Sequence, residues 1–358
     1  MTKSKFTSLL MQWHKKTNCR AMPWKGEKDP YKIWLSEVIL QQTRVEQGWQ
    51  YYERFIEKYP TIQQLAKAKD EAIFKLWEGL GYYNRCKNLL FTARFVATAL
   101  NGKFPQTYDE IVSLKGIGPY TAAAISSFAY NLPYAVVDGN VFRVLSRVFG
   151  IETAIDSTNG KKEFTQLAEK VLDTINPGEY NQAIMDFGAT VCKPMAPLCS
   201  TCVLQKICVA CKEGKVNQLP FKEKVLQKKH RWFYYFLIEH DDKILVHKRT
   251  QKDIWENLFE FYLLESTEQI KWNIEIVAQW LKEQFALQNA DVVNISAVSS
   301  QQLTHQQIKG QFIKLKLKKI PKSLEHYQWQ PIKKVNALAF PKFINQYLSQ
   351  TSLQQSLF

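Results

Sequence analysis

Two carboxyl groups in the first half of the sequence, Glu37 and Asp138, lie in surroundings of opposite character. Glu37 is flanked one helical turn away by Ile33 and Trp34 on one side and by Leu40 on the other, so it shares a largely apolar helix face. Removal from water there is expected to raise its pKa. Asp138 precedes a predicted helix, where N–H donors and the helix dipole are expected to lower its pKa.

Together these two groups resemble the carboxyl pair of glycosidases, in which one carboxyl is protonated and acts as an acid while the other is ionised. Asp138 taken alone is also explained as an ordinary helix cap, a role that is compatible with catalysis. Glu37 taken alone is also explained as a surface residue at a helix kink. Pattern alone leaves these interpretations open.

Four of the seven cysteines form a C-x6-C-x2-C-x5-C run within seventeen residues, at Cys192, Cys199, Cys202 and Cys208. Because a basic intracellular chain rarely holds disulfides, this density indicates ligation of a soft metal, either zinc or iron in a sulfide cluster. Cys211 completes two C-x2-C pairs, but the five residues between the pairs are fewer than a zinc ribbon uses. A cluster is therefore favoured, and the other cysteines are expected to be buried thiols: Cys19, Cys86 and Cys211.

The stretch LKGIGPY at 114–120 carries two glycines immediately before a predicted helix. Gly116 and Gly118 permit backbone angles that a side chain would forbid, and they let another molecule approach the main chain. Pro119 suits the first helical position, and the unpaired N–H groups there favour an anion such as phosphate. An ordinary tight connection between helices explains the same residues.

The charge balance points to a polyanionic partner. Lys and Arg number 48 against 33 Asp and Glu, a formal net charge of +15, and this field attracts nucleic acid. Charge alone also fits a membrane surface, but no apolar run reaches spanning length and the N-terminus has no signal-peptide pattern. We therefore expect a soluble, intracellular, two-domain protein.

Hydrophobic periodicity assigns helices to the first two hundred residues, with helix starts at Asp29-Pro30, Asp70 and Asp138. Beyond residue 212 the chain becomes polar and basic and shows no convincing period, as a connector does. Two strand patterns then flank Asp241-Asp242, a further strand alternates around residues 313–317, and helices are expected at 273–287 and 341–348. The second half is therefore predicted to have an α+β fold.

Several motifs resemble those of MutY-type adenine DNA glycosylases, in the helix-hairpin-helix superfamily that includes endonuclease III. They are the glycine turn followed by Tyr120, the cysteine spacing, DPYKIWLSEVILQQT at 29–43, GLGYYNR at 79–85, VVDGNVFRVLSR at 136–147 and NQAIMDFGATVC at 181–192. The resemblance implies a mainly α-helical catalytic region, built from a six-helix module and an iron–sulfur module. It also implies a 4Fe-4S cluster on the four cysteines of the run.

The same resemblance implies roles in base excision repair of DNA. Glu37 would protonate the adenine that leaves, and Asp138 would stabilise or trap the oxocarbenium-like sugar. In endonuclease III enzymes the residue that corresponds to Tyr120 is a lysine, which forms a Schiff base and cuts the strand. Tyr120 cannot form that imine, so we expect base removal without efficient strand cleavage.

Substrate contacts are implied as well. Gln42 and Tyr82 lie in motifs that wedge into the duplex when a nucleotide is extruded. The glycine turn, Gly116 and Gly118, would hold a phosphate without reading sequence. The remaining positions match the family's adenine pocket and the motif around Asp138: Trp24, Lys25, Gln182 and Asn140.

The second half resembles, more weakly, the Nudix-like domain with which these enzymes recognise 8-oxoguanine opposite adenine. Thr304 and His305 would sense the lesion, with Leu303 in place of the family's aromatic residue. The Glu-rich metal helix of Nudix hydrolases is missing, so no nucleotide hydrolysis is expected. The predicted boundaries are 1–211 for the glycosylase region with the cluster loop 192–208, 212–230 for the connector, 231–350 for the Nudix-like domain and 351–358 for a tail.

The tail, Gln354 to Phe358, resembles the peptide by which bacterial repair proteins bind the sliding clamp. The expected partner is double-stranded DNA containing 8-oxoguanine:A or G:A, bound by a cytoplasmic monomer that does not attach to a membrane. Two alternatives stay open: a mismatch thymine or uracil glycosylase on the same scaffold, and a non-enzymatic iron–sulfur protein that binds DNA or senses redox state.

Overall fold

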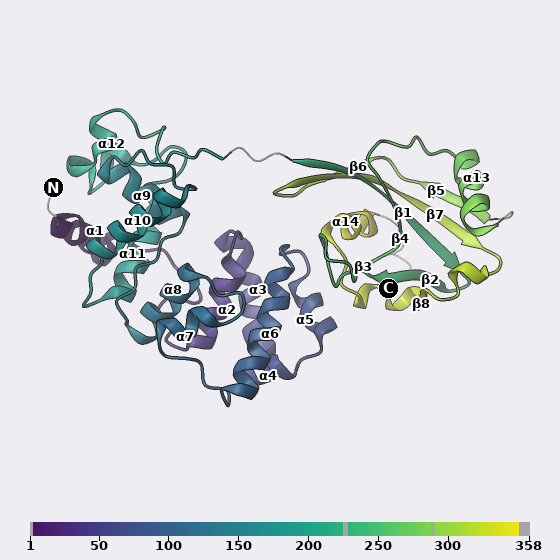
Figure 1. The fold of residues 1–358 in the computed structure, drawn as a ribbon, viewed down its shortest axis with the longest axis horizontal. Coiled ribbons are helices and arrows are strands. Elements are labelled where there is room, and N and C mark those ends of the chain that lie inside the picture. Colours follow the sequence, from purple (N-terminus) through teal and green to yellow (C-terminus); the bar gives the residue numbers. More distant parts are fainter. Residues whose placement is uncertain (1–2, 225–227, 288–289, 351–358) are drawn as a thin grey trace. The chain divides into compact units, whose positions relative to one another are not determined.

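The chain forms two compact units in a computed structural model that describes residues 3–224, 228–287 and 290–350 (Figure 1). The first unit comprises Met1–Lys67 and Lys87–Val225, and the second comprises Ala68–Cys86 and Leu226–Phe358. The second unit therefore takes a segment of the N-terminal half together with the C-terminal domain. The clamp-like tail lies outside the described residues.

The first unit is helical, as predicted. Its helices are α1 (Lys3–Thr17), α2 (Pro30–Leu40), α3 (Val45–Lys58), α4 (Ile62–Lys67), α6 (Asn84–Ala99, whose first turn belongs to the second unit), α7 (Tyr108–Ser113), α8 (Pro119–Tyr130), α9 (Gly139–Phe149), α10 (Thr158–Val171), α11 (Pro177–Thr190) and α12 (Val209–Lys212). Two 3₁₀ turns, Cys199–Thr201 and Gln205–Ile207, lie in the cysteine segment.

Helix starts follow local capping chemistry. Asp29 caps α2 by accepting a hydrogen bond from the Tyr31 N–H, with Pro30 in the first turn, as predicted. Thr107 and Glu110 form a capping box at α7, the first helix of the helical hairpin. The predicted cap at Asp70 is wrong by one residue, because α5 (Asp70–Trp77) is preceded by Lys69 and Asp70 already lies in the first turn.

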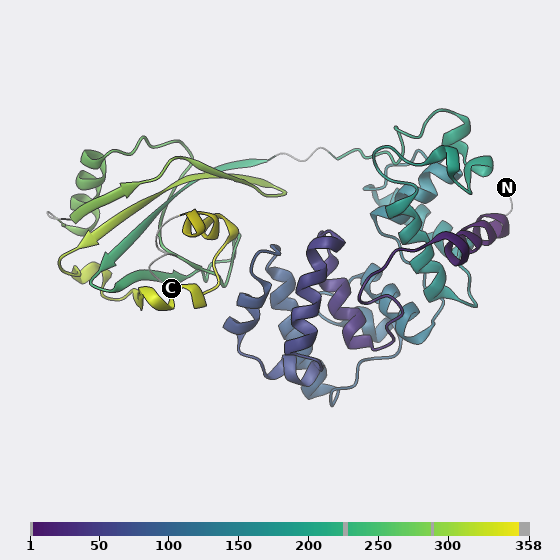
Figure 2. The same cartoon turned by 180° about the vertical axis from the view of Figure 1, so that it is seen from behind.

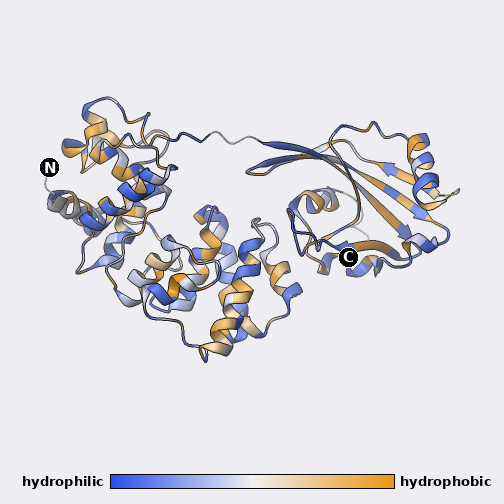
Figure 3. Ribbon diagram, in the orientation of Figure 1, coloured by the Kyte–Doolittle hydropathy of each residue, from blue (hydrophilic) through white to orange (hydrophobic). Residues whose placement is uncertain are grey.

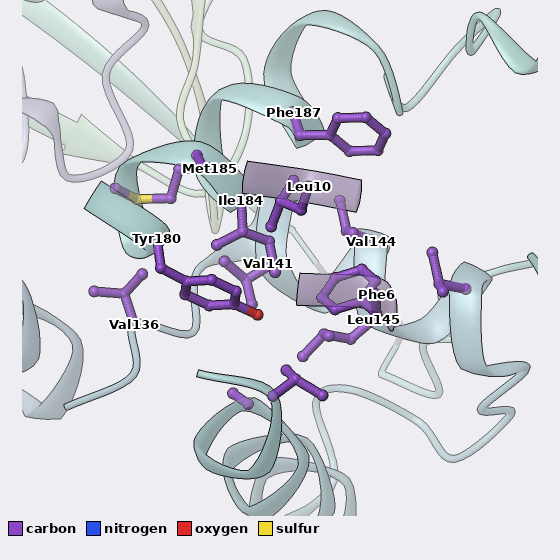
Figure 4. Packing of buried hydrophobic residues seen from close by; sticks show 14 of the residues in the cluster. Phe6, Leu10, Val136, Val141, Val144, Leu145, Tyr180, Ile184, Met185 and Phe187 are labelled. Atoms are coloured by element: carbon purple, nitrogen blue, oxygen red, sulfur yellow. The ribbon is translucent and has the colours of Figure 1, made fainter. Parts of the chain in front are cut away.

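One core fixes the elements that carry Asp138. Helix α11 packs against α1, α8 and α9, and α10 packs against α1 and α9 (Figures 1 and 2). Figure 4 shows their interlocking side chains, which are fully or almost fully buried: Phe6, Leu10, Val136, Val141, Val144, Leu145, Tyr180, Ile184, Met185 and Phe187. Because Val136 and Val141 belong to this core on either side of Asp138, the cap is held at the core's edge.

The second unit contains one eight-stranded sheet in the order β3-β2-β1-β7-β5, with β4 paired to β1, β6 to β7 and β8 to β2. The strands are β1 (Lys229–His240), β2 (Lys243–Lys248), β3 (Phe259–Glu260), β4 (Tyr262–Ser266), β5 (Ala290–Ile295), β6 (Ser299–Gln302), β7 (Gln306–Leu317) and β8 (Gln328–Pro331). The β1–β2 hairpin turns at Asp241 and the 313–317 strand is part of β7, as predicted. Strand β1 begins within the predicted connector.

Helices α5, α13 (Ile274–Phe285) and α14 (Lys342–Gln350) complete this unit, with short 3₁₀ turns at Lys322–Leu324 and Ile332–Ala337. Hydrophobic colour runs along β2 and alternates with polar colour around the helices of the first unit (Figure 3). Within the described residues, no helix is long and apolar enough to span a membrane.

Segment 68–86 is hydrogen-bonded to the C-terminal part of the second unit. Lys75 Nζ donates to the Leu338 carbonyl at 3.0 Å, and Glu78 accepts from the Phe340 N–H at 2.8 Å. Glu71 also pairs with Lys248 at 3.5 Å. The GLGYYNR motif at 79–85 is therefore attached to the sheet domain by polar contacts.

Candidate active site

Glu37 is an almost fully buried carboxyl on α2, with 6% of its surface exposed. Burial is the main reason that its pKa rises to about 7. A hydrogen bond from the Tyr120 hydroxyl opposes the rise, and the negative charge of Asp138 adds to it. The predicted direction is confirmed, and near neutral pH this carboxyl can hold a proton and give it up.

Asp138 caps α9 and accepts three hydrogen bonds. The N–H groups of Asn140 and Val141 donate to its Oδ1 at 2.8 Å each, and the Asn140 side-chain amide donates to Oδ2 at 2.7 Å. Its pKa is nevertheless raised, because burial outweighs these donors, so the predicted lowering is wrong. The donors still favour the anion, so Asp138 is the member of the pair that is better held in the charged form.

Tyr120 connects the two carboxyls. Its hydroxyl donates to the Met185 sulfur, a weak acceptor, at 3.4 Å and is also placed to donate to Glu37. Burial, followed by the charges of Glu37 and Asp138, raises its pKa well above the usual value for a phenol. Tyr120 is therefore a neutral hydrogen-bond donor at physiological pH, and the structure brings Glu37, Asp138 and Tyr120 into one interacting group.

The raised pKa of Glu37 predicts a pH-dependent stability. The folded chain retains this proton up to about pH 7, whereas an unfolded glutamate loses it near its ordinary pKa of 4.5. The folded state thus binds more protons over that interval, and stability falls as pH rises through it. Glu37→Gln should raise the unfolding free energy at pH 8 by up to about 3 kcal/mol and should gain much less at pH 4.

Urea unfolding at the two pH values measures this difference. Glu46→Gln, at an exposed position in the first turn of α3, is the control and should give equal small changes at both. An equal gain for Glu37→Gln at both pH values would show that its carboxyl ionises normally.

The glycine turn joins α7 to α8. Gly116 has φ +82°, and a Cβ there would lie 2.6 Å from the Asn88 Cβ, so both the backbone angle and the space require glycine. Gly118 has an ordinary φ of −97° and open space where its Cβ would be. Only Gly116 needs a special backbone angle, whereas Gly118 leaves the uncapped start of α8 open to an anion.

Both predicted wedge residues have strained backbones and exposed side chains. Gln42, in the turn after α2, has φ +57°, and Tyr82 has φ +48° with 43% of its surface exposed. Such angles are uncommon for residues with a Cβ and are maintained by the surrounding fold. The turn after α2 and the GLGYYNR loop therefore each project a side chain outward.

The predicted adenine-pocket residues Lys25 and Gln182 meet at a residue that the sequence analysis did not select. Asp186 on α11 is fully buried, and four side chains donate to its carboxylate: Asn18 at 2.8 Å, Arg20 at 3.0 Å, Lys25 at 3.2 Å and Gln182 at 2.9 Å. Because the Gln182 amide nitrogen is used in this way, its oxygen is left as an acceptor. Trp24 packs instead against Trp49 and Tyr52.

Asp186 is expected to stabilise the first unit. Asp186→Asn keeps the side-chain volume but removes the charge that pairs with Arg20 and Lys25, which are themselves 22% and 27% exposed. Because water can solvate the two partly exposed cations once the carboxylate is gone, we expect Asp186→Asn to lower the free energy of unfolding by about 1–3 kcal/mol. Glu179→Gln on the same helix breaks only the exposed pair with Lys15 and should cost no more than about 0.5 kcal/mol.

Thermal or urea unfolding of the two variants checks the comparison. Equal stability of Asp186→Asn and Glu179→Gln would show that the buried carboxylate does not organise its four donors.

Thr304 and His305 occupy the turn of the β6–β7 hairpin, and both are exposed. The Thr304 hydroxyl contacts the Tyr82 hydroxyl within the second unit. The His305 carbonyl accepts from the Lys229 N–H at 3.0 Å, which ties the turn to the start of β1. A predicted lesion-sensing residue and a predicted wedge residue are thus direct neighbours.

The four cysteines of the run line one common pocket, which Cys211 also lines. Among the described residues, no three Cys, His, Asp or Glu side chains converge on a point that would hold a single metal ion. A pocket lined by thiols offers a donor set that fits an iron–sulfur cluster. The expectation of three buried thiols is confirmed for Cys86 only, because Cys19 is exposed and Cys211 is half-buried in this pocket.

Two arginines of α9 hold the cysteine segment. Arg147 donates to the Leu219 and Lys193 carbonyls at 2.9 and 2.8 Å. Arg143 donates to the Cys192 carbonyl at 2.7 Å and to the Asn140 side-chain oxygen at 2.8 Å. Through Asn140, the segment that carries Cys192 is connected to Asp138 by hydrogen bonds.

Comparison with known proteins agrees with this geometry. Residues 35–173 match the model of the HhH-GPD superfamily base excision DNA repair protein, and residues 234–350 match that of the NUDIX domain. The adenine DNA glycosylase of Buchnera aphidicola subsp. Acyrthosiphon pisum is 36% identical over 285 residues, covering 79% of each chain. The chain belongs to the adenine DNA glycosylase family. The mouse member is 41% identical over 227 residues, covering 60% of this chain and 44% of the mouse protein.

Solved structures of related glycosylases share the fold. A thermostable thymine-DNA glycosylase is 30% identical with a TM-score of 0.55, covering 59% of this chain and 97% of that chain. A trapped endonuclease III–DNA covalent intermediate gives a TM-score of 0.52 at 22% identity, covering 60% of this chain and 99% of that chain. A large part of this adenine DNA glycosylase family member therefore has no counterpart in either.

Sequence reasoning missed Asp186, Arg143 and Arg147. One signal was present, because a charged residue four positions after Gln182 in the apolar stretch NQAIMDFGATVC is expected on the same helix face. The arginines gave no such signal, since a basic residue on a helix is usually a solvated one.

Proposed function

We propose that the protein is a monofunctional glycosylase that hydrolyses the N-glycosidic bond of adenine mispaired with 8-oxoguanine or guanine in DNA. The observation that carries the proposal is the buried Glu37 carboxyl, whose pKa of about 7 lets it act as an acid, beside Asp138 and its three donors. Family membership supplies the substrate class, because the relatives are named adenine DNA glycosylases.

In this mechanism Glu37 gives its proton to the adenine ring, which turns the base into a neutral leaving group. The bond to the sugar breaks and positive charge develops on the sugar ring. The Asp138 anion stabilises that charge, and water then attacks the sugar carbon and releases a proton to solvent. If Asp138 itself attacks, water afterwards hydrolyses the covalent bond between the sugar and the carboxylate. Tyr120 donates a hydrogen bond to Glu37 and holds its carboxyl in place.

Reaching the base requires that the nucleotide leave the duplex. Gln42 and Tyr82 project from strained turns and would fill the gap, while Gly118 would approach a backbone phosphate. Lys25 and the Gln182 oxygen, both oriented by Asp186, would contact the extruded adenine. Thr304 and His305 would contact the opposite base. The Nudix-like domain would thus recognise 8-oxoguanine and would hydrolyse no nucleotide.

Because position 120 is a tyrosine and carries no amine, we expect the reaction to stop at base removal. Base release by the native chain should leave an intact strand with an abasic site, which breaks only after alkali treatment. Borohydride added during turnover should trap no covalent DNA adduct, because a phenol forms no imine. Gel electrophoresis measures both results, and a trapped adduct would reveal another amine at the site.

One duplex assay tests the proposed substrate. The native chain is incubated with 8-oxoguanine:A, G:A, G:T and G:U duplexes and then treated with alkali. Cleavage at adenine in the first two duplexes is the expected result. The likeness to a thymine-DNA glycosylase makes cleavage of G:T or G:U the main competing outcome, and no cleavage would favour a non-enzymatic role.

We also propose a 4Fe-4S cluster on Cys192, Cys199, Cys202 and Cys208, whose thiols line a common pocket. Bound there, it would fix the segment after α11 and so support the backbone around Cys192. Iron analysis and the cluster's visible absorption distinguish it from zinc. Clamp binding by Gln354–Phe358 stays a prediction, which a pull-down with residues 354–358 deleted would test.

A further inference from the structure

Cys211, the fifth cysteine of the pocket, has no role in the ligand set proposed above. It lies on α12, three residues after Cys208, and positions three apart share one side of a helical turn. The Cys199 and Cys211 thiols are close enough to interact, and both side chains line the pocket. Cys211 is therefore a neighbour of one proposed ligand in space and of another along the chain.

We propose that Cys211 is a reserve ligand of the iron–sulfur cluster, which replaces Cys199 when that cysteine is lost or displaced. The inference rests on the proposed function, because it requires the cluster to be bound. The exchange needs no oxidant or reductant. The Cys211 thiol releases its proton to solvent as its sulfur binds iron, and the departing Cys199 thiolate takes up a proton.

The surroundings single out Cys199 as the ligand that is replaced. Cys192 is fixed on both sides, since Arg143 binds its carbonyl and Arg147 binds the next carbonyl along the chain. Cys202 interacts with Cys192, Cys208 and Cys199. The Cys208 thiol donates to the Arg147 carbonyl at 3.3 Å. Cys199 begins a short 3₁₀ turn, and Cys211 is the cysteine with which its thiol interacts most strongly.

Iron content of full-length chains purified identically tests the inference. Alanine is used because a serine oxygen can itself bind iron. Cys199→Ala should retain the native iron content, whereas Cys202→Ala and the double variant Cys199→Ala/Cys211→Ala should lose it. Loss of iron from Cys199→Ala to the level of the double variant overturns the proposal. Retention of iron by the double variant overturns it equally, since Cys211 would then be unnecessary.

A second measurement does not depend on variants that lack a primary ligand. Native chain, Cys211→Ala and Cys19→Ala are exposed to an iron chelator, and cluster absorption is followed with time. Cys211→Ala should lose iron several-fold faster than native, because a ligand that dissociates has no replacement. Cys19→Ala, which removes an exposed thiol outside the pocket, should match native. Equal rates for all three chains overturn the proposal.

The two failures are distinguishable. A native chain that binds no iron refutes the cluster itself, and the reserve ligand with it. A native chain that binds iron, with a Cys199→Ala variant that does not, refutes the reserve ligand alone.

Discussion

Glu37→Gln should release adenine from an 8-oxoguanine:A duplex about 10²- to 10⁴-fold more slowly than the native chain. The amide keeps the shape of the side chain but carries no acidic proton, so the leaving base departs as an anion. Native activity should also fall as pH rises through about 7, where Glu37 loses its proton. Single-turnover rates across pH 5 to 9 measure both effects.

Two comparisons make this result specific. The residual rate of Glu37→Gln should lack the decline around pH 7, since the titrating group is gone. Glu46→Gln should keep both the native rate and the native pH profile. A Glu37→Gln variant that releases adenine at the native rate would remove Glu37 from the mechanism.

Asp138→Asn is the second large effect, and we expect a loss of about 10²- to 10³-fold in the rate of base release. Asparagine is as good a helix cap as aspartate, so α9 should still begin at Gly139. The variant removes the negative charge opposite the developing cation of the sugar, and of the three hydrogen bonds it loses only the one from the Asn140 side chain to Oδ2. Its rate and its melting temperature are measured together, and the melting temperature should change little.

The matched control is Asp29→Asn. Asp29 caps α2 with the same chemistry, accepting from the Tyr31 N–H at 2.9 Å. Its charge lies outside the proposed mechanism, so its activity should stay within a few-fold of native. If the two variants lose activity equally, the effect of Asp138→Asn belongs to capping and not to catalysis.

Local pattern was enough to predict the elements and one half of the carboxyl pair. The apolar residues around Glu37 recur at helical spacing, so burial of its carboxyl and the direction of its pKa followed from the sequence. Asp138 shows the limit of that reasoning. Its donors come from the next three residues and were predictable, whereas the removal of its carboxyl from water depends on the whole fold and reversed the direction of the pKa shift.

The features of the site that local pattern did not predict depend on contacts between positions far apart in the sequence. Asp186 binds Lys25, Arg20 and Asn18 across sequence separations of 161, 166 and 168 residues. No periodicity connects such positions, so the residue that orients the predicted pocket was not selected. Gly118 illustrates the opposite case, since a glycine chosen for backbone freedom turned out to have an ordinary backbone angle.

The attachment of segment 68–86 changes what a shortened enzyme would be. A chain cut off before the sheet domain would leave Lys75 without the Leu338 carbonyl, Glu78 without the Phe340 N–H, and the Tyr82 hydroxyl without Thr304. Such a fragment would lose the turn that carries Thr304 and His305 together with the contacts that hold the GLGYYNR loop. Weakened excision by a truncated enzyme would therefore not by itself measure the proposed lesion recognition.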